Sequence, residues 1–174
     1  MISGALQHSV NVRSWIKSNR RLLSIAGTIL SIVHPDQYNV GMTVLDQIRR
    51  HPEKVSNETF FKEILEGWGC PFTEFIVTSN HKISLYRSIA GRGNWLDILL
   101  SFGQYEGGYV VLPDIKANFE YQTGTAIVMC VKILRHTVER TTSGDRMSFR
   151  FSVRENMAKW LDLKVDNTFS QYFM

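Results

Sequence analysis

Two residues with complementary chemistry lie ten positions apart in the second half of the chain, His136 and Arg146. An imidazole binds metal ions, and a guanidinium forks onto a carboxylate. A turn over 141–145 separates the two residues, so we expect them on the two arms of a hairpin. There the pair could flank one cavity and suit a diacid bound to a metal. In an alternating strand Ser148 shares the face of Arg146, and its hydroxyl could reach the same carboxylate.

A simpler interpretation of the same spacing stays open. Arg146 and Arg150 could extend into water from the edge of a sheet, with His136 in a turn. Asp97 is equally ambiguous, because it could face a cavity or cap a turn. The turn or edge role is favoured for Asp97.

The elements that must position these residues differ between the two parts of the chain. Apolar residues recur at helical spacing in three early stretches, Trp15–Val33, Tyr38–Ile48 and Phe60–Gly67. Later segments are typical of strands: Trp95–Phe102, Gly108–Leu112, Lys116–Gln122, Thr125–Leu134 and Arg146–Arg154. Many short strands predict a barrel or jelly roll. Helices followed by strands predict an α+β fold with the N-terminal helices packed against one sheet.

The size and composition are those of an ordinary globular protein. The chain has 174 residues, 44% of them hydrophobic and 21% charged, so we expect one domain over 1–174. Within it we expect helical support over about 12–66, a strand core over about 72–154, and a C-terminal helix and tail over about 155–174. The net charge of +4 permits an anionic partner without requiring one.

The cysteines and the apolar segments exclude several classes of protein. Cys70 and Cys130 do not form a C-x-x-C motif, so free thiols are expected rather than a zinc ribbon or redox site. We see no signal peptide and no apolar run long enough to cross a bilayer. The expected location is therefore intracellular, the nucleus included.

The order of several motifs resembles a known family. The motifs are Gly103-x-Tyr105-x-Gly107-Gly108, Leu112-Pro113, Tyr121-x-x-Gly124-Thr125, Leu134-Arg135-His136 and Arg146-x-Ser148. Over roughly 12–163 the chain resembles fungal relatives of the ten-eleven-translocation and base-J-binding (TET/JBP) dioxygenases, which oxidise methyl groups on DNA pyrimidines. The resemblance implies a double-stranded β-helix (jelly roll), Fe(II) and 2-oxoglutarate as cofactors, and DNA with a modified pyrimidine as partner.

The family holds iron with an H-x-D motif and a distal histidine. By resemblance the distal, metal-binding histidine falls on His136. The arginine that binds 2-oxoglutarate falls on Arg146, with Ser148 beside it. The H-x-D motif falls on Tyr86 and Ser88, so the sequence departs from the family there.

That departure weakens the expected metal site. A phenol has a reference pKa of about 10 and is a poor ligand for Fe(II) until it ionises. A serine hydroxyl is a weak neutral donor. A literal H-x-D occurs only at His34-Pro35-Asp36, where a helix is expected to end. There we interpret His34 as a helix C-terminal residue and Asp36 as the cap of the next helix.

Three hypotheses remain open for the function. The first is a dioxygenase-fold protein that is catalytically impaired, a pseudoenzyme, because Tyr86 and Ser88 replace the iron ligands. The second is an active 2-oxoglutarate dioxygenase that oxidises 5-methylpyrimidines in DNA. The third is a non-enzymatic binding module that keeps only the fold. Basic residues that could contact phosphates, or simply form a solvated helix face, are Arg13, Lys17, Arg20, Arg21, Arg49 and Arg50.

Overall fold

The computed structural model describes residues 11–54, 58–88 and 92–163. The described residues divide into two compact units, one within 11–72 with 161–163, and one within 73–160. The single domain expected over 1–174 stays a prediction. The expected tail beyond residue 163 and the side chain of Arg13 lie outside the described part.

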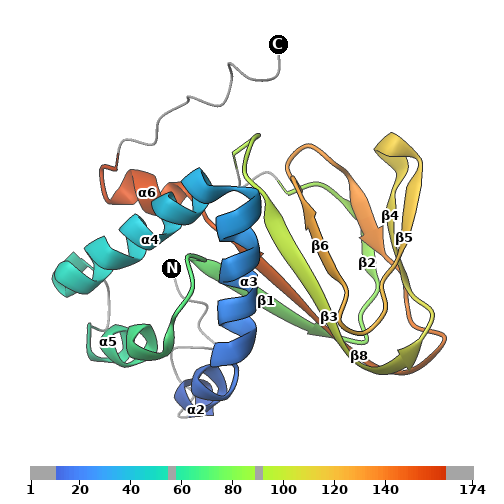
Figure 1. Ribbon diagram of the computed structural model, residues 1–174, viewed down its shortest axis with the longest axis horizontal. Helices are drawn as coiled ribbons and strands as arrows, with labels where there is room; N and C mark the ends of the chain where they lie inside the picture. The colour runs from blue at the N-terminus through green and yellow to red at the C-terminus, as the bar shows by residue number, and fades with distance from the viewer. Residues whose placement is uncertain (1–10, 55–57, 89–91, 164–174) are drawn as a thin grey trace. The chain divides into compact units, whose positions relative to one another are not determined.

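The helical unit contains the three amphipathic stretches that the sequence predicts (Figure 1). Its elements are α2 (Asn11–Ser18), α3 (Arg20–Val33), α4 (Pro35–Arg50), the 3₁₀ turn η1 (Pro52–Lys54) and α5 (Glu58–Gly67). The first stretch was predicted as one helix, but it breaks at Asn19. The Asn19 side chain donates to the Trp15 carbonyl at 2.8 Å, and this local bond competes with continuation of the helix.

His34 forms the junction of α3 and α4. Its backbone N–H donates to the Leu30 carbonyl at 2.9 Å and ends α3. Its ring Nδ1 accepts from the Gln37 N–H at 3.3 Å and caps α4. The prediction that Asp36 caps this helix was therefore wrong. His34 does this instead, and Pro35 occupies the first turn, where the missing N–H costs no hydrogen bond.

The second unit consists of two antiparallel four-stranded sheets, ordered β1-β8-β3-β6 and β2-β7-β4-β5 (Figure 1). The strands are β1 (Glu74–Ser79), β2 (Ile83–Tyr86), β3 (Asp97–Glu106), β4 (Tyr109–Leu112), β5 (Ala117–Glu120), β6 (Ala126–Met129), β7 (His136–Val138) and β8 (Ser143–Ser152). A 3₁₀ turn, η2 (Pro113–Ile115), follows β4, and the helix α6 (Glu155–Trp160) follows β8. This arrangement confirms the α+β jelly-roll class.

The core of the sheet unit is built from inward-facing residues of both sheets, as the alternating patterns predict. Its fully or nearly buried members are Leu99, Val110, Leu112, Tyr121, Met129, Val131 and Val138. Strand β8 has a different character on each face. Arg146, Ser148 and Arg150 alternate with Phe149 and Phe151, whose rings stack near the ring of Phe75, at 6.2 Å and 5.3 Å between centroids.

The structure bears on two sequence expectations, the state of the cysteines and the apolar character of the helices. Cys70 and Cys130 are both free. Burial raises the pKa of the Cys70 thiol to about 12. Among the described residues, none of the helices has the length and apolar character needed to span a bilayer.

Candidate functional site

A pocket of about 90 Å³ lies between the two sheets. Strands of both sheets line it, so its walls are fixed by the strand pairing. The lining residues are Ile76, Thr78, Ile83, Tyr86, Leu99, Tyr121, His136, Val138, Ser148, Phe149 and Arg150. Three of the residues singled out in the sequence, His136, Tyr86 and Ser148, thus meet in one pocket. The predicted hairpin was wrong, because His136 lies on β7 of one sheet and Arg146 on β8 of the other, and the two sheets face each other across the pocket.

His136 and Tyr86 are direct cross-strand neighbours on β7 and β2. Their ring centroids lie 4.6 Å apart, with the planes tilted by 54°. His136 is fully buried, and neither ring nitrogen has a hydrogen-bond partner within the described part of the chain. Burial lowers the pKa of the His136 imidazole, the backbone of Leu134 opposes the shift, and nearby Arg150 adds to it. The ring is therefore neutral near pH 7 and keeps a free lone pair.

Ser88 takes a different position from the one that the resemblance implies. Ser88 is buried, and its backbone N–H donates to the Val131 carbonyl at 2.9 Å. It is not among the residues that line the pocket. The H-x-D register therefore brings Tyr86, but not Ser88, to the pocket wall.

Arg146 is a buried residue of the sheet interior. Only 1% of it is exposed, so the interpretation as a solvent-facing edge is wrong. Its Nη2 donates to the Glu139 carbonyl at 2.7 Å and to the His81 carbonyl at 3.3 Å. Its guanidinium lies over the rings of Tyr105 and Tyr121, at 5.9 Å and 5.8 Å from their centroids. Burial lowers the pKa of Arg146, and the two tyrosines oppose this shift.

Arg146 keeps free hydrogen-bonding capacity beside the pocket. Its Nε and Nη1 have no hydrogen-bond partner among the described residues. It does not itself line the pocket, but Tyr121, whose ring it covers, does. Gly108 explains how the guanidinium fits there, because a Cβ at this position would lie 2.5 Å from Arg146 Nη1. Gly108 also has φ of +89°, a backbone conformation that favours glycine, so its role is structural.

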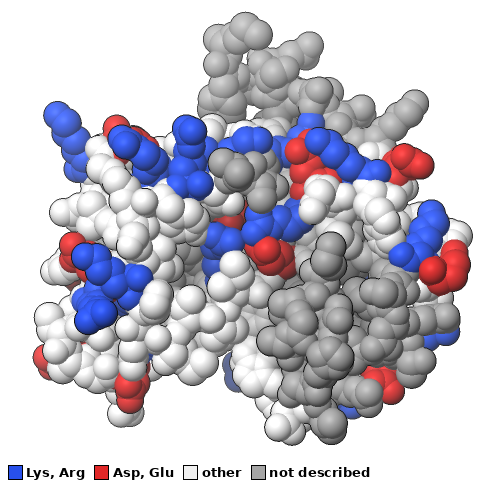
Figure 2. Space-filling model, turned by 180° about the vertical axis from the view of Figure 1, so that it is seen from behind, with Lys and Arg blue, Asp and Glu red and all other residues white. Residues whose placement is uncertain are grey.

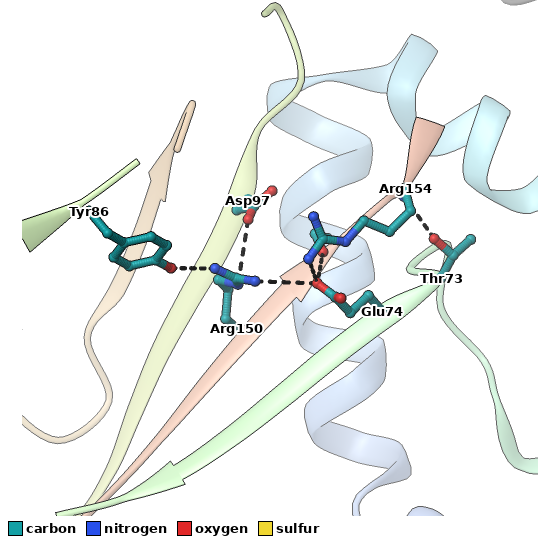
Figure 3. Close-up of polar contacts among 7 residues, drawn as sticks. Thr73, Glu74, Tyr86, Asp97, Arg150 and Arg154 are labelled. Atoms are coloured by element: carbon teal, nitrogen blue, oxygen red, sulfur yellow. Dashed lines mark hydrogen bonds and ion pairs between the residues drawn. The ribbon is translucent and has the colours of Figure 1, made fainter. Parts of the chain in front are cut away.

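Arg150 is the pocket residue that sequence reasoning missed (Figure 3). It donates from Nη1 to the Tyr86 hydroxyl and from Nη2 to Glu74 Oε2 at 3.3 Å. Its Nε lies 3.7 Å from Asp97 Oδ2. Arg154 also donates to Glu74, which is thereby shared between two guanidinium groups. The available signal was the alternation of β8, which puts Arg150 on the same face as Arg146.

Asp97 belongs to this network rather than to a turn, so the favoured turn or edge role was wrong. It begins β3, and only 7% of it is exposed. Burial raises the pKa of the Asp97 carboxyl to about 6, and the charges of Arg150 and Arg154 limit the rise. Asp97 is therefore ionised near pH 7 and pairs with Arg150.

The donor set of the pocket does not fit the iron site of the family. That site needs two imidazoles and a carboxylate. Here one imidazole, His136, is joined by the phenol of Tyr86 and the guanidinium of Arg150. Within 11–54, 58–88 and 92–163, no group of three histidine, cysteine or acidic residues is placed to hold a metal ion. The carboxylate-binding half fits better, because Arg146 has N–H donors without a partner among the described residues and shares its face of β8 with Ser148.

Comparison with known proteins agrees with the fold and the motif order. The model of the Tet_JBP family, described as the oxygenase domain of the 2OGFeDO superfamily, matches residues 3–155. The chain belongs to this TET/JBP family. No curated protein sequence matches it.

A solved structure of NgTET1, in complex with 5mC DNA, has the same fold. Its TM-score is 0.63 at 15% identity, and the match covers 88% of this chain and 55% of that one. The chain thus spans about half the length of NgTET1. A cupin protein from Desulfovibrio desulfuricans matches over 45% of this chain and 71% of its own, at 13% identity and a TM-score of 0.31, which is too low to support an argument.

Proposed function

We propose that this chain is a TET/JBP-like oxygenase-fold protein that is catalytically impaired, because it lacks the iron centre of the family. One observation supports this most directly. Tyr86 and Arg150 occupy the pocket beside His136, where an active member needs a second imidazole and a carboxylate. A neutral phenol does not replace an imidazole as a ligand for Fe(II), and a guanidinium offers no lone pair at all.

The proposal includes a retained site for a diacid such as 2-oxoglutarate. Arg146 is buried and its Nε and Nη1 are unused, so a ligand carboxylate would satisfy two donors and one charge together. Ser148 lines the pocket next to it and supplies a hydroxyl. His136, Arg146 and Ser148 are thus proposed as ligand-binding residues, with Fe(II) bound weakly or not at all. The fungal affiliation suggested by the motifs is part of the same proposal.

The test measures metal and ligand separately. Anaerobic titration with Fe(II) should give no saturable binding at micromolar metal, and addition of 2-oxoglutarate and oxygen should give no decarboxylation. Calorimetry without metal should detect binding of 2-oxoglutarate that Arg146→Gln weakens at least tenfold. Arg140→Gln is the matched control, because Arg140 is an exposed arginine in the connection between β7 and β8.

Each result has a distinct consequence. Iron-dependent decarboxylation by the native chain would show that it is an active dioxygenase. Absence of any 2-oxoglutarate binding would leave a binding module that keeps only the fold. Tyr86→His/Ser88→Asp tests the register, because it should gain affinity for divalent metal if these positions correspond to the H-x-D motif.

DNA is proposed as the partner, because NgTET1 has this fold and is in complex with 5mC DNA. A target base would have to be flipped out of the duplex to reach a pocket inside the sheets. Of the candidate phosphate contacts, Arg49 donates to the carbonyls of Leu65 and Trp68, and Arg50 pairs with Asp46 at 2.9 Å. This leaves three exposed basic residues on α2 and α3, namely Lys17, Arg20 and Arg21.

Positive and negative side chains of the described residues are interspersed on the face that Figure 2 shows, and they do not form one continuous basic patch. In Figure 2, Lys and Arg alternate with Asp and Glu among the described residues. Weak, salt-dependent binding is therefore expected. Fluorescence anisotropy with a duplex containing 5-methylcytosine should show binding that Arg20→Gln/Arg21→Gln reduces and that falls with salt. Equal affinity of that variant and the native chain would argue against these contacts.

A further inference from the structure

Arg150 places a permanent positive charge in the pocket, next to the residue that replaces the first iron ligand. Its side chain is 14% exposed, and its Nη1 donates to the Tyr86 hydroxyl. Tyr86 in turn packs against the ring of His136 at 4.6 Å between centroids. All three residues line the same pocket. A guanidinium therefore lies where a divalent cation would have to be accommodated.

We infer that Arg150 is a built-in cation that excludes divalent metal from this pocket, independently of the missing iron ligands. The inference rests on the proposed function, and it adds a third residue to the two that depart from the H-x-D motif. It implies that restoring the motif alone does not restore a metal site. The guanidinium has to be removed as well.

Two acidic residues hold Arg150 in position. Glu74 of β1 accepts from Nη2 at 3.3 Å, and Asp97 of β3 lies 3.7 Å from Nε. Both strands pair with β8, the strand of Arg150, one on each side of it. Arg150 thus has anionic partners on both sides (Figure 3), and turning away from Tyr86 would break these contacts.

The hydrogen bond to Tyr86 shows how the exclusion works. In the native chain the phenol oxygen accepts from Arg150. If an imidazole replaced the phenol, its unprotonated nitrogen would be the nearest acceptor for the same N–H. The lone pair needed by the metal would then be engaged by Arg150. A second positive charge in the same pocket would also be repelled, because few mobile ions or waters screen charges inside a protein.

The test measures Co(II) binding by absorption in three variants. The first is Tyr86→His/Ser88→Asp. The second adds Asp97→Asn, which keeps Arg150 but removes a carboxylate that could bind metal itself. The third adds Asp97→Asn and Arg150→Gln, which removes one positive and one negative charge together and leaves Glu74 paired with Arg154. The third variant should bind Co(II) at least tenfold more tightly than the second, and a smaller ratio overturns the inference.

A control and a second measurement keep the result interpretable. Arg154→Gln in place of Arg150→Gln removes the same charge from the same network, but from a residue that does not line the pocket, and it should give no gain. Every variant is first checked for cooperative thermal unfolding. If the Arg150→Gln variant does not fold, the single variant Tyr86→His tests the inference instead, because Arg150 is still in place next to the introduced imidazole. By NMR, the imidazole introduced at position 86 should titrate below the ordinary value of about 6.5, and an unshifted titration overturns the inference.

Failure of this inference differs from failure of the proposed function. Saturable Co(II) or Fe(II) binding by the native chain would overturn both. If the native chain binds no metal and the second variant binds it as tightly as the third, only the role of Arg150 is refuted, and the loss of iron is then explained by Tyr86 and Ser88 alone.

Discussion

Arg146 and Arg150 are the same residue type on the same face of β8, one on each side of Ser148, yet their surroundings differ. Arg150 has a phenol and two carboxylates as partners, all from its own chain. Arg146 has two backbone carbonyls and two aromatic faces, and two of its nitrogens have no hydrogen-bond partner in the described part of the chain. One buried charge is neutralised internally, and the other is not.

The difference indicates which end of the pocket can receive a ligand. A buried charge is costly unless it is paired and hydrogen-bonded. Arg150 is paired with two carboxylates without a ligand, and only its Nε lacks a hydrogen-bond partner among the described residues. Arg146 meets that requirement only in part, so a carboxylate that reaches it gains a charge-assisted hydrogen bond without displacing an existing acid. Under the proposed function, the chain retains an anion site, and its own side chains close the adjoining cation site.

The largest expected effect is that of Arg150→Met on stability. Removing one partner of a buried ion pair leaves Asp97 uncompensated, so the free energy of unfolding should fall by about 3–5 kcal/mol. Urea denaturation followed by tryptophan fluorescence measures it. Arg135→Met removes an arginine from an exposed pair with Asp114 and should have little effect. If both substitutions lowered the free energy of unfolding equally, the buried pairing of Arg150 would contribute no more than an exposed pair, which contradicts the comparison.

A pH dependence should follow from Asp97. Its carboxyl pKa is about 6 in the folded chain, against an ordinary value of 3.8, so the folded state binds the proton more tightly. Stability should therefore fall as pH rises from about 4 to about 6, by about 3 kcal/mol in total for this group, and stay lower above that range. Asp97→Asn removes the dependence. The stability difference between native chain and variant, measured at pH 4 and pH 7, should change by this amount, and a constant difference would contradict the prediction.

Gly108→Ala probes the space occupied by Arg146. Gly108 and Gly124 both have positive φ, +89° and +82°, but only at Gly108 would a Cβ meet a side chain, Arg146 Nη1 at 2.5 Å. The backbone strain is thus common to both substitutions. We expect Gly108→Ala to lower the free energy of unfolding by about 1–2 kcal/mol more than Gly124→Ala, because the guanidinium must shift. Equal losses in thermal unfolding would show that the contact is easily relieved.

The smallest effect on stability is expected for Arg146→Met. The substitution removes a buried charge that lacks an anionic partner, while two carbonyls lose a donor. These effects oppose one another, so the net change should be about 1 kcal/mol or less. Binding of 2-oxoglutarate should nevertheless be lost. A large destabilisation would mean that Arg146 is structural rather than available to a ligand.

Much of the fold could be predicted from the sequence, because its signals are local. Alternation along Arg146–Arg154 fixed the two faces of β8, and the apolar spacing located the helices. The break at Asn19 was missed because a polar side chain can either face solvent or bond the preceding turn, and the spacing does not distinguish these outcomes.

The candidate site could be predicted only in part. Motif order placed His136 and Tyr86, which are indeed neighbours. The role of Arg150 was not predictable, because alternation gives the face of a residue and not its partners. Glu74 lies 76 positions away in the sequence, and Asp97 comes from another strand again. Ser88 shows the same limit, since its position two residues after Tyr86 did not bring it to the pocket wall.

Under the proposed function, the contacts that join Arg150 to Tyr86, Asp97 and Glu74 also restrict the evolutionary path back to an oxygenase. If Tyr86 were replaced first, the Arg150 guanidinium would still occupy the pocket. If Arg150 were replaced first, the buried Asp97 would lose its positively charged partner. Each single step would therefore lower fitness or stability before any gain appeared. Descendants of this chain should keep Tyr86, Asp97 and Arg150 together or exchange them together, a pattern of coordinated substitution that sequences of its close relatives can reveal.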